Sequence, residues 1–213
     1  MSDIRGVASI ASPTRVADGA FVGARATRDG GLVVADWKLM MALEGRCFHA
    51  GAGLDMTAIT SIAFDQDRPD FWLSIPSGTT ILPYRVEVAV MSAEEGTDGA
   101  IYIARVTDAP SATAGATATT AITNTRSDLP RTSLVTARQL ADANLSLTGY
   151  SGIAVMSRPV ASINPLNFLY EPVVPEVLVG PAGLYNKASA TTTQMLIRVM
   201  VSWAEFPTTH INL

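Results

Sequence analysis

The sequence predicts an all-β domain of two packed sheets, a sandwich or jelly roll. Residues 81–91 and 193–206 alternate with the period of two that is typical of a strand with one buried face. Clusters of proline, glycine and serine separate these segments from other short apolar ones, so about eight strands are expected. No stretch shows a helical pattern of convincing length. The chain of 213 residues is long enough for one such domain.

The N-terminal part lacks a clear period. Residues 1–30 mix alanine, glycine and arginine with nearly balanced charges, which predicts an extended arm and leaves residues 31–213 for the jelly-roll domain. Residues 31–53 allow two interpretations. Apolar side chains alternate from Trp37 to Leu43 as in a strand, whereas Asp36 is suited to cap a short helix over the same residues. The alternation favours the strand.

The centre of the chain has clearer strand patterns. Predicted strands span residues 58–64, 71–75, 81–91 and 100–107. The turn cluster Pro76-Ser77-Gly78 ends the second of these, and the polar residues 94–99 predict a hairpin that joins the last two. In the third strand one face is expected to be buried and the other partly wet. The buried face would hold Leu82, Tyr84, Val86, Val88 and Val90, and the wet face Arg85 and Glu87.

Residues 108–136 break this pattern. Ala109–Thr125 consists almost entirely of alanine, threonine, serine and glycine, which predicts a long loop that orders against a partner. Strand signals return at residues 145–148, 153–158 and 168–179, and prolines interrupt the last of these. After the turn Gly180–Gly183, a final strand ends at Pro207. One face of this strand is expected to carry Met195, Ile197, Val199, Val201 and Trp203.

The composition indicates an assembled protein. Only 16% of the residues are charged, against about 25% in an ordinary soluble domain. The mean hydropathy is +0.26. Neighbouring subunits are therefore expected to cover much of the surface, because interfaces lose charged residues at their centres. A lightly charged surface rich in alanine and threonine remains the alternative.

Several partners and compartments are not expected. The net charge is −4 without a basic run, so direct nucleic-acid binding is not predicted. Cys47 is the only cysteine, which excludes a disulfide within the chain. The first residues lack the features of a signal peptide, and no apolar run approaches the length of a membrane span. We therefore expect synthesis in a cytoplasm and no membrane partner.

Two groups of segments resemble a known family. They are Phe71–Pro76, Ser77–Thr80 and Ile81–Pro83, and, near the end, Gly180–Tyr185, Thr191–Gln194 and Ser202–Pro207. Their arrangement is similar to the single jelly-roll structural proteins of phage and other viral particles, whose folds look like tumour-necrosis-factor-type trimers. The resemblance covers about residues 55–107 and 165–207. It implies a capsid or capsid-decorating subunit of a virion, commonly trimeric, with no catalytic residues and no cofactor.

Metal ligands are sparse in this sequence. Cupin enzymes share the jelly-roll shape but need a His-x-His pair, whereas His49 and His210 are far apart here. Asp65, Asp67 and Asp70 are weak candidates for a calcium site because their carboxylates offer oxygen ligands. The spacing departs from an EF-hand loop, since Asp70 occupies the position that needs glycine. A solvated turn is the expectation.

Candidate residues for catalysis or for sugar stacking are also few. Cys47 and His49 would share one face of a strand, yet no acid orients the histidine, so a buried thiol is expected instead of a nucleophile. Trp37, Trp72 and Trp203 are expected to anchor a core or an interface, although a sugar-stacking platform is the other possibility.

Together these observations predict a virion structural protein that is not an enzyme. It is expected to form a homo-oligomer, a trimer, and to pack against neighbouring capsid proteins, with the arm and the long loop clasping them. The predicted assembly residues are Trp203, Phe206 and Tyr185. The alternative is a trimeric receptor- or glycan-binding head with the same fold, which would present aromatic and polar groups in its loops. An enzyme ranks third, because no convergent acid, base or metal set is visible.

Overall fold

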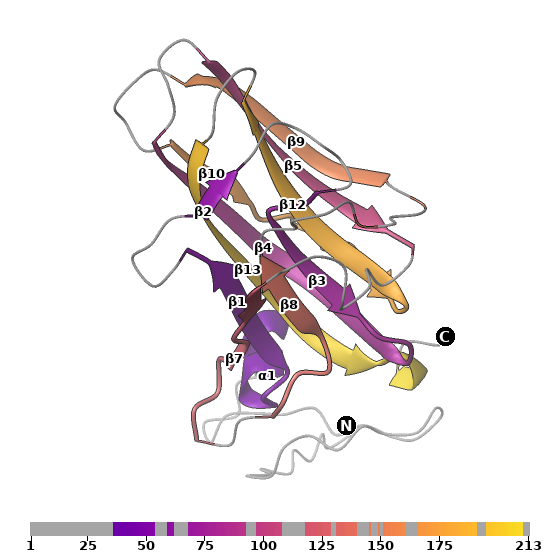
Figure 1. The fold of residues 1–213 in the computed structure, drawn as a ribbon. Helices are drawn as coiled ribbons and strands as arrows, with labels where there is room; N and C mark the ends of the chain where they lie inside the picture. Colours follow the sequence, from indigo (N-terminus) through magenta and orange to yellow (C-terminus); the bar gives the residue numbers. More distant parts are fainter. Residues whose placement is uncertain are drawn as a thin grey trace, which may run out of the picture.

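The computed structural model describes residues 36–53, 59–61, 68–92, 97–107, 118–128, 131–139, 145, 149, 151–160, 166–190 and 195–210. These residues form two antiparallel sheets that lie one over the other (Figure 1). The prediction of an all-β sandwich is therefore confirmed. The predicted arm, residues 1–30, and residues 146–148 of one predicted strand lie outside the described residues, and Leu145 belongs to no strand.

The first sheet has seven strands, in the order β10-β4-β13-β1-β7, with β11 also paired to β4 and β2 to β13. Its long central pair, β4 and β13, covers two of the segments with a clear period of two in the sequence. The strands of this sheet are β1 (Cys47–Ala52), β2 (Ile59–Ser61), β4 (Thr79–Ser92), β7 (Thr123–Asn124), β10 (Leu166–Tyr170), β11 (Leu178–Val179) and β13 (Met195–Pro207).

The second sheet has six strands, in the order β6-β8-β3-β12-β5-β9. They are β3 (Phe71–Ile75), β5 (Thr97–Val106), β6 (Ala118–Thr120), β8 (Thr136–Gln139), β9 (Ser151–Val160) and β12 (Ala182–Ala190). A helix, α1 (Trp37–Leu43), and a 3-10 turn, η1 (Thr208–His210), complete the described elements.

The hairpin predicted for residues 81–107 is wrong. β4 pairs with β13, β10 and β11 in the first sheet, whereas β5 pairs with β12 and β9 in the second. The chain thus crosses from one sheet to the other after β4. Alternating side chains show that a strand has one buried face, but they do not identify the strand that lies beside it.

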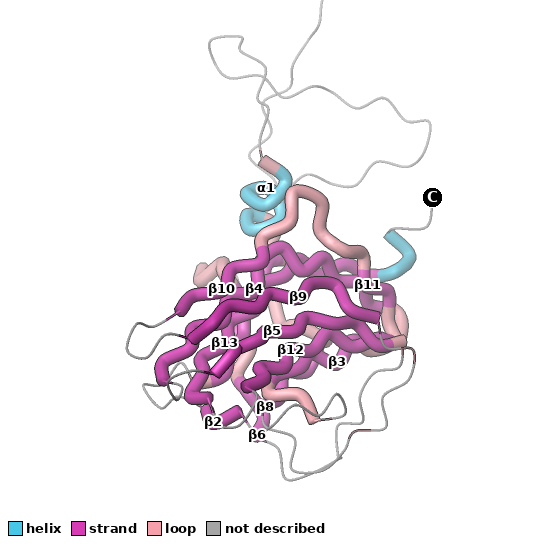
Figure 2. Tube along the Cα trace, turned by 90° about the horizontal axis from the view of Figure 1, so that it is seen from above, coloured by secondary structure: helices cyan, strands magenta, loops and turns pink. Residues whose placement is uncertain are grey.

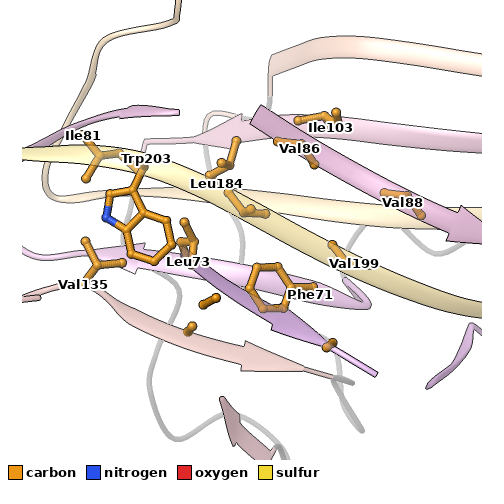
Figure 3. Close-up of a cluster of buried hydrophobic side chains, with 14 of the residues drawn as sticks. Phe71, Leu73, Ile81, Val86, Val88, Ile103, Val135, Leu184, Val199 and Trp203 are labelled. Atoms are coloured by element: carbon orange, nitrogen blue, oxygen red, sulfur yellow. The ribbon is translucent and has the colours of Figure 1, made fainter. Parts of the chain in front are cut away.

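Apolar side chains from both sheets meet in the main core (Figure 3). Phe71 and Leu184 extend from the second sheet, and Val88, Val199 and Trp203 from the first. The predicted face of the final strand is confirmed for Ile197, Val199, Val201 and Trp203, which are all buried in this cluster.

A β-bulge changes the predicted face of β4. Ser202 lies opposite Arg85, but the next residue, Trp203, lies opposite Pro83, so Tyr84 is an extra residue in its strand. Such a bulge shifts the phase of a strand. Val86, Val88 and Val90 face the core as predicted, whereas the prediction that Leu82 and Tyr84 join them is wrong.

The favoured strand over residues 37–43 is also wrong, because these residues form α1. The side chain of Asp36 accepts a hydrogen bond from the backbone N–H of Lys38 at 2.7 Å, as the alternative interpretation required. Met40 and Ala42 are as apolar as the alternating Trp37, Leu39, Met41 and Leu43, so the pattern did not discriminate between helix and strand. The helix lies against the outer face of the first sheet, where the rings of Trp37 and Tyr84 meet edge to face.

The predicted Ala/Thr-rich loop, Ala109–Thr125, is wrong for its last part. Residues 118–120 form β6, which pairs with β8, and residues 123–124 form β7, which pairs with β1. Residues 109–117 lie outside the described residues. Small side chains carry no strong strand signal, but their backbone groups still complete a ladder at the edge of a sheet.

Candidate assembly surface

The segment that joins β10 to β11 exposes two valines almost completely. Its sequence, residues 171–177, is Glu-Pro-Val-Val-Pro-Glu-Val, and the side chains of Val173 and Val174 are 97% and 80% exposed. Pro172 and Pro175 each fix their own φ angle and restrict the preceding residue to extended conformations. The two valines are therefore held in a stiff backbone. We call residues 171–177 the valine arch.

Ion pairs hold both ends of the valine arch. At one end, Oε1 of Glu171 lies 3.0 Å from Nζ of Lys38 in α1. At the other end, Oε2 of Glu176 lies 3.4 Å from Nη1 of Arg105 in β5. Such exposed pairs contribute little to stability, about 0–1 kcal/mol each. They do connect the arch to α1 on one side and to the second sheet on the other.

Tyr170 lies at the base of the arch, directly before Glu171. Burial, with a smaller contribution from the nearby Glu176 carboxylate, raises the pKa of Tyr170, so its phenol stays neutral at physiological pH. Val177 ends the arch, Leu169 and Val179 flank it, and each of the three is about half exposed. Leu169 in β10 and Val179 in β11 therefore add apolar area next to the arch.

Helix α1 contributes further apolar groups at this end of the sandwich. Leu39 and Leu43 are 54% and 56% exposed, and residues four apart share one face of a helix. Figure 2 shows the arch and α1 side by side, as the Lys38–Glu171 ion pair requires. Large exposed apolar patches on soluble proteins usually mark interaction sites. The valine arch and α1 therefore form the candidate assembly surface.

The sequence did not predict this surface. It predicted assembly roles for Trp203, Tyr185 and Phe206, whereas it treated the arch as a strand broken by prolines. A pair of valines between two prolines was the signal that could have indicated this surface. Proline interrupts the pairing of a strand, so apolar residues between two prolines are less able to join the core of a sheet.

The three predicted assembly residues lie elsewhere. Trp203 is fully buried in the main core, where its ring stacks on that of Phe48 with centroids 6.1 Å apart. Tyr185 is buried on the other face of the second sheet. Phe206 is half-buried beneath the guanidinium group of Arg46. Trp203 and Tyr185 are enclosed by their own subunit, so an effect of either on assembly would act through the fold and not by direct contact.

The tryptophans do not form a stacking platform. Trp37 lies on α1, Trp72 on the outer face of the second sheet and Trp203 between the sheets. Every aromatic side chain whose exposure the structure describes is buried or half-buried.

Only one of the three acidic residues proposed as weak calcium ligands lies in the described part of the chain. Asp70 is buried and pairs with Lys187, with Oδ1 3.2 Å from Nζ. Asp65 and Asp67 lie outside the described residues. Within the described ranges, no three His, Cys, Asp or Glu side chains gather as a metal site would require.

Cys47 is placed as a structural residue. Its Sγ donates a weak hydrogen bond to the backbone oxygen of Lys38 at 3.8 Å. Burial raises the pKa of the thiol, and a hydrogen bond with Tyr84 offsets this only in part. Because the thiolate is the nucleophile, such a thiol is unreactive near neutral pH. His49 is half-buried on the same strand.

Comparisons of the chain with protein-family models, with curated proteins and with solved structures gave no match. Among the described residues, no helix has the length and apolar character needed to cross a membrane. The function is therefore proposed from the fold and from the candidate assembly surface.

Proposed function

We propose that the protein is a structural subunit of a virus particle, a capsid or capsid-decorating protein that assembles as a homotrimer through the valine arch and α1. The near-complete exposure of Val173 and Val174 on a stiff backbone carries this proposal. Complete burial of a valine side chain contributes about 1.5–3 kcal/mol. A segment that is rigid before binding also loses less conformational freedom when it docks.

The order of the strands supports a jelly roll as the finer description of the sandwich. Without the short strands β2, β6, β7, β8 and β11, eight of the thirteen described strands remain. When these are lettered B to I along the chain, the two sheets read G-D-I-B (β10-β4-β13-β1) and C-H-E-F (β3-β12-β5-β9). This is the order expected of a jelly roll made of two Greek keys. Capsid proteins share that fold with lectins and cupins, so the fold alone does not select the function.

The composition supports the same proposal. A chain with 16% charged residues and −4 net charge has few groups that oppose close packing of identical copies. The receptor- or glycan-binding alternative has less support, because a sugar-binding surface usually presents exposed aromatic rings and the described aromatic side chains are at least half-buried. The virion location and the neighbouring capsid proteins as partners belong to this proposal.

The oligomeric state of the purified full-length protein tests the assembly step. Light scattering coupled to size-exclusion chromatography is expected to give the mass of a trimer. The double variant Val173→Asp/Val174→Asp is expected to give monomers with an unchanged circular dichroism spectrum. Leu134→Asp is the matched control, because Leu134 is a bend residue that is 66% exposed and lies outside the arch. It is expected to remain trimeric.

Electron microscopy tests the virion role separately. The purified protein, mixed with the products of neighbouring genes, is expected to close into shells or to decorate them. A wild-type protein that remains monomeric at micromolar concentration would contradict the assembly proposal. Trimers that never join a particle would support the proposed trimer formation and contradict the proposed capsid role.

A further inference from the structure

A second cluster of buried side chains lies on the face of the six-stranded sheet that points away from the main core. The backbone N–H of Asp70 donates to the oxygen of Asn186, which extends the β3–β12 ladder by one residue. Asp70 therefore lies beside Lys187, just as Trp72 lies opposite Tyr185 in the same ladder. Side chains two residues apart share one face of a strand, so these four form one patch.

Asp70 and Lys187 are buried to an unusual degree for charged residues. The side chains of Lys187 and Asp70 are 0% and 1% exposed. In the other ion pairs among the described residues, the side chains are 16–71% exposed. The buried hydrophobic side chains on this face are Trp72, Ala104, Val106, Leu145 and Tyr185. Ser74 lies on the same face of β3, and Tyr102 of β5 lies opposite Lys187.

Two opposite charges are therefore held side by side away from water. An ammonium group has three N–H donors, and within the described residues Nζ of Lys187 makes one hydrogen bond, to Oδ1 of Asp70. Burial of two charges away from water is costly even when they are paired. An amide formed between the two side chains would remove both charges, and a neutral amide needs less solvation than two ions.

We propose that Lys187 and Asp70 become joined by an isopeptide bond within the chain. In this step one proton passes from the ammonium to the carboxylate, the lone pair of Nζ then attacks Cγ, the new C–N bond forms and the C–OH bond breaks. The hydroxyl leaves with one proton from the nitrogen, so one water molecule is released and nothing is oxidised or reduced. Groups held in reacting geometry behave as if at about 10⁵–10⁸ M, which offsets the slowness of this condensation in free solution.

The bond would give the subunit a covalent brace. It would join β3 to β12 through residues that are 117 positions apart in the sequence. Each of these strands is central in the second sheet, with a paired strand on both sides. Force applied to the sheet, or a transient opening of it, would then be unable to separate these two strands. The inference is independent of the proposed capsid role.

The mass of the intact full-length protein tests the proposal. The purified, folded wild-type chain is expected to be lighter than its sequence by one water molecule. Lys187→Arg is the matched control, because arginine keeps a positive charge beside Asp70 but does not condense with it. The variant is expected to have the full mass of its own sequence. A wild-type chain of full sequence mass would overturn the proposal.

If Lys187→Arg does not fold, peptide mapping of the wild-type protein also shows whether the isopeptide bond is present. Trypsin does not cleave after an acylated lysine, so wild-type protein digested after denaturation should lack cleavage at Lys187. It should also yield one branched peptide that contains both Lys187 and Asp70. Recovery of two separate peptides with free Lys187 and Asp70 side chains would refute the bond.

Discussion

Truncation of Trp203 to alanine tests the central packing of the sandwich. This indole is fully buried between the sheets, on a strand that pairs on both sides, and it stacks on Phe48. Replacement of such a large aromatic side chain by alanine costs about 3–5 kcal/mol. The stack on Phe48 accounts for about 0.5–1.5 kcal/mol of this. The change is a large fraction of a typical stability of about 5–15 kcal/mol.

The indole nitrogen places the expected value near the lower end of that range. Nε1 of Trp203 is buried and has no hydrogen-bond partner among the described residues. An unsatisfied buried donor costs about 1–3 kcal/mol, and the alanine variant recovers this cost. We therefore expect a loss of about 3 kcal/mol for Trp203→Ala. Trp203→Phe keeps part of the aromatic side chain and removes the donor, so it should lose less stability than Trp203→Ala.

Urea unfolding followed by circular dichroism measures this difference. With an m-value of about 3 kcal/mol/M, the midpoint of Trp203→Ala should fall by about 1 M. Its melting temperature should fall by roughly 6–12 °C for a chain of this length. If Trp203→Ala unfolds at the wild-type urea concentration, Trp203 does not support the core, and a role in recognition should be considered instead.

Four further changes test other parts of the structure. Glu205 accepts hydrogen bonds from Ser133 Oγ at 2.6 Å and from Leu134 N at 2.9 Å. Glu205→Ala should therefore lower the free energy of unfolding by about 1–3 kcal/mol in urea titrations. An unchanged urea midpoint would show that these two hydrogen bonds do not stabilise the fold. The raised pKa of Cys47 means that only the unfolded thiol ionises just above about pH 8.5. Stability measured by thermal melting should therefore fall as the pH rises through this value, and the fall should be weaker in Cys47→Ala. Gly78 has φ +81° and open space where a Cβ would stand, so Gly78→Ala should cost about 1–2 kcal/mol from backbone strain alone, and Gly78→Asn should cost less in the same melts. Chelator should leave the melting temperature unchanged, whereas a large drop that Ca²⁺ reverses would indicate a metal site that the sequence interpretation undervalued.

The sequence by itself determined the strands that have a strong local pattern. Phe71–Ile75 was predicted with the bounds that the structure has for β3, and the predicted strand 193–206 corresponds closely to β13 (Met195–Pro207). The turn cluster Pro76-Ser77-Gly78 also lies where predicted, with Gly78 at positive φ. These features depend on side chains that are near one another in the chain, namely an apolar alternation or a glycine that permits a left-handed backbone.

Other features required the tertiary structure. The bulge at Tyr84 depends on the register of β4 against β13. Val173 and Val174 are exposed because no other part of the described fold covers them. The pairing of Asp70 with Lys187 depends on two strands that meet only after folding. The bulge and the ion pair each depend on a contact between segments far apart in the sequence. A local pattern shows that a face is buried, but the identity of the neighbour that buries it is a property of the whole fold.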